Sequence, residues 1–133
     1  MKILIAEDNK PSSYILAKFL EPYGECSIAE NGMIAVDLFV QSIQEGSPYD
    51  LVCIDILMPK MDGLKVLKAI KEIEKETKEA DQPAVKTMMV TALGDTNNIY
   101  KAYEDGCDAY IIKPYTREKI FESLEDMGFS PQR

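Results

Sequence analysis

The chain has 133 residues, 46% hydrophobic and 29% charged, a composition typical of one globular domain with its own core. Its formal net charge of −8, with no stripe of basic and aromatic residues, disfavours direct nucleic-acid binding. The absence of histidine excludes imidazole triads and phosphohistidine donation. The three cysteines form no CxxC pair, and the sequence shows neither an export signal nor an apolar run long enough to cross a membrane, so a cytoplasmic protein is expected.

Short apolar runs alternate with amphipathic stretches five times along the chain. The predicted strands are residues 3–6, 26–29, 51–54, 87–90 and 110–112. The first predicted helix begins near Pro11 and closes at Pro22 and Gly24, the second lies between Asn31-Gly32 and Gly46-Ser47-Pro48, and the others span 64–79, 97–105 and 116–127. Strands that alternate with helices imply right-handed crossovers, and therefore a parallel sheet with helices on both faces.

Several helices have an apolar stripe that is expected to face this sheet. The expected inward residues are Leu16, Leu20, Tyr23, Ile34, Ala35, Leu38, Phe39, Val66, Leu67, Ile70 and Ile73. Residues 71–81 are almost all charged, which predicts a solvated helix end with i,i+4 ion pairs such as Glu74 with Lys78.

Polar side chains follow four of the predicted strands. Glu7 and Asp8 come after the first strand, and Asp55, Thr91 and Lys113 come after the last three. Taken singly, the acids could be turn formers, Thr91 a strand-end hydroxyl and Lys113 a surface lysine. Together they lie at the carboxyl ends of parallel strands, which share one edge of the sheet where ligands bind. Three acids, a hydroxyl and an amine at that edge fit a divalent cation and a phosphoryl group, because carboxylates hold hard cations and the other two groups hold phosphate oxygens.

Further short motifs accompany these residues. The whole set is Glu7-Asp8-Asn9, Asn31-Gly32, Asp55, Met58-Pro59, Met61-Asp62-Gly63, Thr91-Ala92, Gly106, Asp108, Tyr110 and Lys113-Pro114. With this set the sequence resembles the receiver domains of two-component response regulators, of the chemotaxis type, over nearly its whole length. The resemblance implies a doubly wound, flavodoxin-like five-stranded sheet in the order 2-1-3-4-5, with a receiver domain over residues 1–129 and a flexible tail over 130–133.

The resemblance also implies a chemistry for the site. A partner histidine kinase or histidine phosphotransfer protein would supply a phosphoryl group to Asp55, in a reaction that requires Mg²⁺ or Mn²⁺. The implied metal ligands are Asp8, Asp55, the backbone carbonyl of Leu57 and, through water, Glu7. Thr91 and Lys113 would hold the phosphoryl oxygens.

The same resemblance implies a switch that carries the signal onward. Phosphorylation is expected to draw Thr91 toward the phosphate and to let Tyr110 turn inward, which changes a protein-binding surface on the fourth helix and fifth strand. Tyr100, Tyr103 and Tyr115 are expected to be exposed near that surface. The chain is expected to be a signalling switch rather than an enzyme, a single-domain regulator without DNA-binding output, either monomeric or dimeric on phosphorylation.

The sequence departs from the family pattern in three places. The first acid is Glu7, where Asp is commoner. The positions two beyond the acceptor and two beyond Thr91 are Leu57 and Leu93; in the family these tune phosphate lifetime, and apolar residues there predict slow self-dephosphorylation. The interval 55–91 is longer than usual, which predicts extra helix or loop before the fourth strand. The Lys113-Pro114 bond, in contrast, resembles one that is cis in the family, and it is expected to be cis here.

Other functions stay open at this point. The Glu-Asp-Asn opening resembles receivers fused to hybrid histidine kinases, which favours a phosphorelay shuttle as an alternative. A phosphatase with an aspartate nucleophile needs a second acid two residues later, where this chain has Leu57. A flavodoxin-like electron carrier needs a first loop rich in Ser, Thr and Gly to bind the flavin phosphate, and here that loop is acidic.

Overall fold

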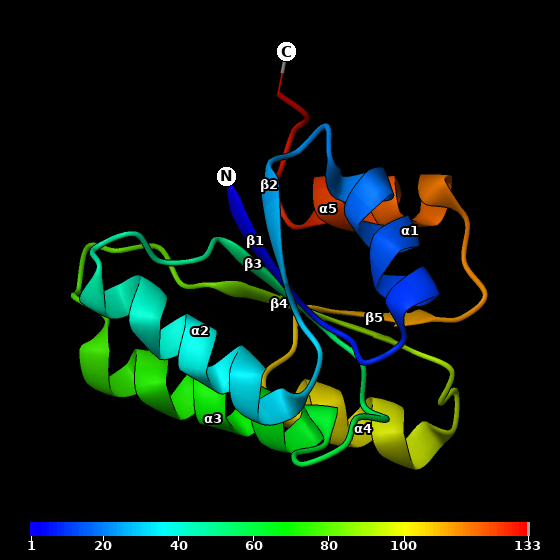
Figure 1. Cartoon of the computed structure of the whole chain (residues 1–133), viewed down its shortest axis with the longest axis horizontal. Coiled ribbons are helices and arrows are strands. Elements are labelled where there is room, and N and C mark those ends of the chain that lie inside the picture. The colour runs from blue at the N-terminus through cyan, green and yellow to red at the C-terminus, as the bar shows by residue number, and fades with distance from the viewer. Residues whose placement is uncertain (133) are drawn as a thin grey trace.

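A five-stranded parallel sheet lies between two layers of helices in the computed structural model, which describes residues 1–132 (Figure 1). The strands are β1 (Lys2–Ala6), β2 (Glu25–Ala29), β3 (Leu51–Ile54), β4 (Lys86–Thr91) and β5 (Ala109–Ile112). The helices are α1 (Lys10–Leu20), α2 (Gly32–Gln44), α3 (Gly63–Thr77), α4 (Thr96–Glu104) and α5 (Arg117–Asp126). The sheet order is β2-β1-β3-β4-β5, so the predicted fold class and strand order are confirmed.

The sheet has a separate core on each face. Helices α1 and α5 cover one face, and α2, α3 and α4 cover the other (Figure 1). The central strand β3 contributes to both, with Leu51 and Cys53 on the α1 side and Val52 and Ile54 on the opposite side. All four residues are buried, which explains why this run has no polar position.

The predicted apolar stripes are correct except at one position in α2. Leu16, Leu20 and Tyr23 are buried, as are Val66, Leu67 and Ile70, while Leu38 and Ile73 pack partly buried against the core. The expectation that Ile34 faces inward is wrong, since its side chain is 37% exposed. The buried residues of α2 are Gly32, Ala35, Phe39 and Ser42, and this helical spacing turns Ile34 away from the sheet.

The long interval before β4 is filled by the end of α3 and a loop over residues 78–85. The expected ion pair between Glu74 and Lys78 does not form, because Lys78 has left the helical conformation at ψ 131°. Instead a Glu74 carboxylate oxygen accepts the backbone N–H of Val85, and the Lys78 amine donates to the carbonyl of Glu79 at 3.1 Å. Glu74 thus fastens the far end of the loop to α3.

The chain after α5 returns toward the end of α1. Within the segment 130–133, for which a flexible tail was predicted, the backbone N–H of Gln132 donates to the carbonyl of Pro22 at 2.6 Å, and Arg133 lies outside the described residues. Across residues 1–132, none of the helices combines the length and apolar character that crossing a bilayer requires.

Candidate functional site

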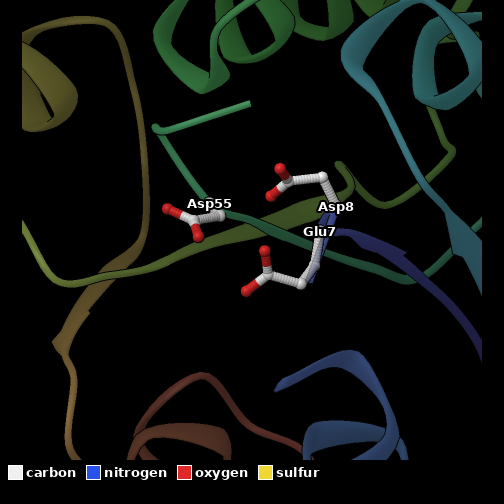
Figure 2. A group of neighbouring side chains, drawn as sticks. All are labelled: Glu7, Asp8 and Asp55. Atoms are coloured by element: carbon white, nitrogen blue, oxygen red, sulfur yellow. The ribbon is translucent and has the colours of Figure 1, made fainter. Parts of the chain in front are cut away.

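The residues singled out in the sequence lie at the carboxyl ends of four strands. Glu7 and Asp8 follow β1, Asp55 follows β3, Thr91 ends β4 and Lys113 follows β5. Figure 2 shows the three acidic side chains side by side at this edge, two from the loop after β1 and one from the end of the neighbouring strand. Carboxylate oxygens of the three acids lie within 4.8 Å of one another, so the predicted convergence of the acids is observed.

Lys113 lies between two of these acids. Its Nζ donates to Asp55 Oδ2 at 3.1 Å and also to Glu7 Oε1. Glu7 and Asp55 are 5% and 7% exposed, whereas Asp8 is open to solvent. The amine offsets part of the repulsion between buried carboxylates, and the exposed side of the cluster remains acidic.

In the Lys113–Glu7 pair, burial and hydrogen bonding shift the pKa of each group in opposite directions. Burial raises the pKa of Glu7 above its ordinary value, and its hydrogen bond with Lys113 offsets only part of that shift. Burial lowers the pKa of Lys113, but the hydrogen bonds to Glu7 and Asp55 outweigh it and the net direction is upward. The amine therefore stays protonated at neutral pH, as a group that binds phosphoryl oxygens must.

Backbone turns fix the orientation of the carboxylates. The N–H of Asn9 donates to Glu7 Oε2 at 3.2 Å, and the N–H of Leu57 donates to Asp55 Oδ1 at 3.1 Å. Asn9 also caps α1 by accepting the N–H of Ser12 at 2.9 Å. The segment Glu7-Asp8-Asn9 therefore forms a turn and caps α1, as its local sequence suggests, and it also contributes two acids to the cluster.

Two glycines let neighbouring helices approach the loop between β3 and α3. A Cβ on Gly63 would lie 2.2 Å from the carbonyl oxygen of Asp55, and a Cβ on Gly32 would lie 2.1 Å from the carbonyl oxygen of Met61. No side chain fits at either distance, so both positions require glycine. Sequence reasoning did not assign these residues to the site, although the Asn31-Gly32 and Asp62-Gly63 dipeptides were the available signals.

The two predicted switch residues meet at Leu93. Thr91 is fully buried, and its hydroxyl accepts the N–H of Leu93 at 3.4 Å. The hydroxyl of the half-buried Tyr110 donates to the carbonyl of the same residue. The Thr91 hydroxyl therefore contacts Leu93 and not the acidic cluster. Burial of the Tyr110 ring raises the pKa of its hydroxyl.

The tyrosines expected on the nearby surface divide into two groups. Tyr100 and Tyr103 on α4 are exposed, as predicted. The expectation for Tyr115 is wrong, because its ring packs edge-on against Phe19 with a centroid distance of 6.0 Å, and burial raises its pKa to about 12. The bond before Pro114 that leads to Tyr115 is cis, as predicted.

The fold and this edge define a class of protein, the doubly wound α/β domains that bind ligands at the carboxyl ends of parallel strands. Comparison with known proteins defines the family. The family model for the response regulator receiver domain matches residues 3–125, and the chain belongs to that family, the receiver domains of two-component signalling.

Individual relatives agree with this assignment. The chain is 30% identical to the chemotaxis protein CheY of Halobacterium salinarum, over 95% of both proteins. It is 34% identical to the hybrid signal transduction histidine kinase L of Dictyostelium discoideum, over 96% of this chain but only 7% of that protein. Among solved structures, a chain of the CheX-CheY-BeF3-Mg²⁺ complex from Borrelia burgdorferi is similar with a TM-score of 0.82 and 25% identity, over 96% of this chain and 88% of that one.

Proposed function

We propose that Asp55 accepts a phosphoryl group from the phosphohistidine of a partner histidine kinase or histidine phosphotransfer protein, and that its modification changes a surface that binds a downstream protein. One observation carries this proposal: the buried Asp55 carboxylate lies 3.1 Å from the Lys113 amine and within 4.8 Å of the Glu7 and Asp8 carboxylates. The site thus combines a carboxylate that can accept the phosphoryl group, an amine that can bind its oxygens, and an acidic cluster that can bind a metal ion. In this role the domain is a cytoplasmic switch and not an enzyme that turns over a separate substrate.

The donor set fits Mg²⁺. Three carboxylates with oxygens within 4.8 Å of one another form a hard, oxygen-only cluster, which Mg²⁺ and Mn²⁺ both accept. Asp8 and Asp55 would bind the ion directly, together with the carbonyl of Leu57, and Glu7 would act through water. When bound, the ion neutralises negative charge that spreads over the phosphoryl oxygens during transfer. The related Borrelia burgdorferi complex contains BeF3 and Mg²⁺, which supports this assignment.

The residues of the chain divide the remaining work. An Asp55 carboxylate oxygen forms the new bond to phosphorus as the phosphorus–nitrogen bond of phosphohistidine breaks, and the released imidazole keeps the electron pair and takes up a proton. The Lys113 amine exchanges its contact with Asp55 for one with a phosphoryl oxygen. The Thr91 hydroxyl then leaves Leu93 to donate to a second phosphoryl oxygen.

Incubation with acetyl phosphate tests the proposal. With Mg²⁺ present, the intact protein should gain the mass of one phosphoryl group, and peptide mapping should locate an acyl phosphate at residue 55. With a chelator present the gain should disappear, because the clustered carboxylates then repel the donor. An unmodified protein at saturating donor and Mg²⁺, or a phosphoryl group mapped to another residue, contradicts the proposal.

The phosphorylated form is expected to lose its phosphoryl group slowly. Leu57 is 56% exposed beside the acceptor, and Leu93 lies partly buried near Thr91, so neither side chain can orient a water molecule for attack on phosphorus. After removal of the donor, we expect the modified mass to persist for minutes or longer. Introducing a polar side chain through Leu93→Asn should shorten that time. A wild-type half-life of seconds would refute the expectation.

Thr91→Ala is expected to separate phosphorylation from its structural response. The variant retains Asp55 and Lys113 and should still be modified, but it lacks the hydroxyl that links the phosphate to Leu93 and, through the Leu93 carbonyl, to Tyr110. NMR spectra with and without beryllofluoride should therefore show much smaller shifts at Tyr110 and α4 than in wild type. Thr91→Ser, which keeps the hydroxyl, is the matched control. A wild-type response in Thr91→Ala contradicts the coupling.

A phosphorelay role is the second candidate. The 34% identity to a hybrid histidine kinase favours a domain that passes its phosphoryl group onward to a histidine phosphotransfer protein. Transfer from the modified domain back to such a protein distinguishes this shuttle from a terminal switch. The aspartate-nucleophile phosphatase is disfavoured, since Leu57 occupies the position that a second acid would need.

A further inference from the structure

We infer that a cavity at the amino-terminal edge of the sheet binds small aromatic amines. The cavity has a volume of about 550 Å³ and lies between the ends of α2 and α3 and the loop that follows α3. Its lining includes Asp50, directly before β3, and Lys86, the first residue of β4, whereas the acidic cluster lies at the opposite ends of the strands. The cavity is therefore separate from the proposed phosphoryl acceptor, and the inference does not depend on that proposal.

The loop over residues 78–85 builds one wall of the cavity. Figure 1 shows α2 and α3 side by side, with the chain leaving the end of each helix to return to the sheet on the left of the view. Gln82, Pro83 and Val85 line the cavity from the loop. The hydrogen bond from the Val85 N–H to the Glu74 carboxylate holds this loop against α3. The loop fills the interval that is longer than usual for a receiver domain, so the cavity is built by a segment in which the chain departs from the family pattern.

Aromatic rings give the cavity an apolar interior. The lining contains Phe39, Tyr49 and Phe129, of which the first two are buried and the third is half-buried. Binding sites for small molecules typically have volumes of about 300–1000 Å³ and mostly apolar walls with a few polar groups. The ring of Tyr49 already attracts one cation of the chain, since Lys2 Nζ lies 4.7 Å from its centroid. The interior thus suits a planar apolar ligand that carries a positive charge.

One acidic side chain offers a free acceptor for that charge. Glu74 is half-buried in the lining, and one of its carboxylate oxygens accepts the N–H of Val85, while the other accepts no hydrogen bond from residues 1–132. The Lys78 amine, in contrast, already donates to the carbonyl of Glu79 at 3.1 Å. Acids outnumber lysines in the lining, and the whole chain has a net charge of −8. An amine is therefore favoured in the cavity over a carboxylate or a phosphate.

Three indoles of similar size test the charge preference, because tryptamine is cationic, tryptophol neutral and indole-3-acetate anionic at neutral pH. In NMR titrations of the whole chain, tryptamine should shift the amide signals of residues 39–49 and 74–86 with a Kd of about 1 mM, as expected for a ligand of this size. Tryptophol should bind the same cavity about fivefold more weakly, and indole-3-acetate more weakly still, because a charge-assisted hydrogen bond is stronger than a neutral one. No shift of these amides at about 10 mM tryptamine, or equal binding of indole-3-acetate, would overturn the inference.

Glu74→Gln identifies the acceptor. The variant keeps an oxygen for the Val85 N–H, so it should leave tryptophol binding unchanged and weaken tryptamine binding about fivefold. Glu76→Gln is the matched control, because Glu76 lies on the same helix but is exposed and outside the lining, and this variant should bind both probes like wild type.

Three other outcomes of these titrations would overturn the inference. An equal loss of tryptamine affinity in Glu74→Gln and Glu76→Gln would show attraction to the overall negative charge and not to the cavity. Equal losses of tryptamine and tryptophol affinity in Glu74→Gln would show that no charge is recognised by Glu74. Shifts of the same amides on dilution without any probe would place a second copy of the chain in the cavity.

Discussion

Asp55→Asn is expected to abolish phosphorylation, both by acetyl phosphate and by a phosphohistidine donor. A carboxamide is a poor nucleophile toward phosphorus and cannot form the acyl phosphate. The substitution keeps the size of the side chain and an oxygen that can accept the N–H of Leu57, and Lys113 keeps its bond to Glu7. The loss should therefore reflect chemistry at residue 55 and not unfolding.

Intact mass after incubation with donor and Mg²⁺ measures this loss, and thermal unfolding monitored by circular dichroism checks the fold. Asp62→Asn is the matched control. Asp62 lies in the same loop but caps α3 by accepting the N–H groups of Leu64 and Lys65 at 3.0 and 3.1 Å, and Asn serves equally well as an N-cap. The control should be phosphorylated like wild type. Equal modification of Asp55→Asn would place the acceptor elsewhere.

Features that depend on chain periodicity could be predicted from the sequence. The five strands and the edge on which the polar residues gather follow from alternating apolar runs and from right-handed connections between parallel strands. The order of the strands, which the sheet confirms, was implied only by the resemblance to receiver domains. The acids and the lysine converge because Glu7, Asp55 and Lys113 each directly follow a strand of the same sheet, and Asp8 is the next residue after Glu7. Such features need no knowledge of side-chain packing.

Features that depend on packing could not be predicted. The sequence predicts an exposed Tyr115, but the ring packs edge-on against Phe19 on α1, which is far away in the sequence. The i,i+4 spacing predicts an ion pair between Glu74 and Lys78, but the partner of Glu74 is the backbone N–H of Val85, which the following loop brings close. In both residues a contact between distant segments overrides the local pattern.

The dual contact of Lys113 belongs to the second kind. The sequence predicts an amine and three acids at one edge, but it does not show that each carboxylate oxygen of Glu7 accepts a hydrogen bond, whereas Asp8 accepts none from residues 1–132. Which hydrogen bonds each acid accepts is therefore information that only the three-dimensional arrangement supplies.

Gly63→Ala is expected to destabilise the domain and to slow phosphorylation together. The new Cβ would lie 2.2 Å from the carbonyl oxygen of Asp55, 2.7 Å from its carbonyl carbon and 2.7 Å from Cα of Ile56, so backbone atoms of the acceptor loop must move. Overpacking of this kind costs about 1–3 kcal/mol of unfolding free energy. Alanine otherwise favours a helix by about 1 kcal/mol over glycine, so without the clash Gly63→Ala would raise the free energy of unfolding instead of lowering it.

Displacement of the Asp55 backbone should also misalign its carboxylate with Lys113, and a shift of about 1 Å can reduce a rate by about a hundredfold. Urea unfolding and the initial rate with acetyl phosphate measure the two effects. Gly94→Ala is the control, because its nearest neighbour is the flexible end of Ile112, with Cδ1 at 3.2 Å, and the side chain can move aside. If both substitutions changed stability and rate equally, close approach of α3 to the acceptor loop would not be what holds Asp55 in place.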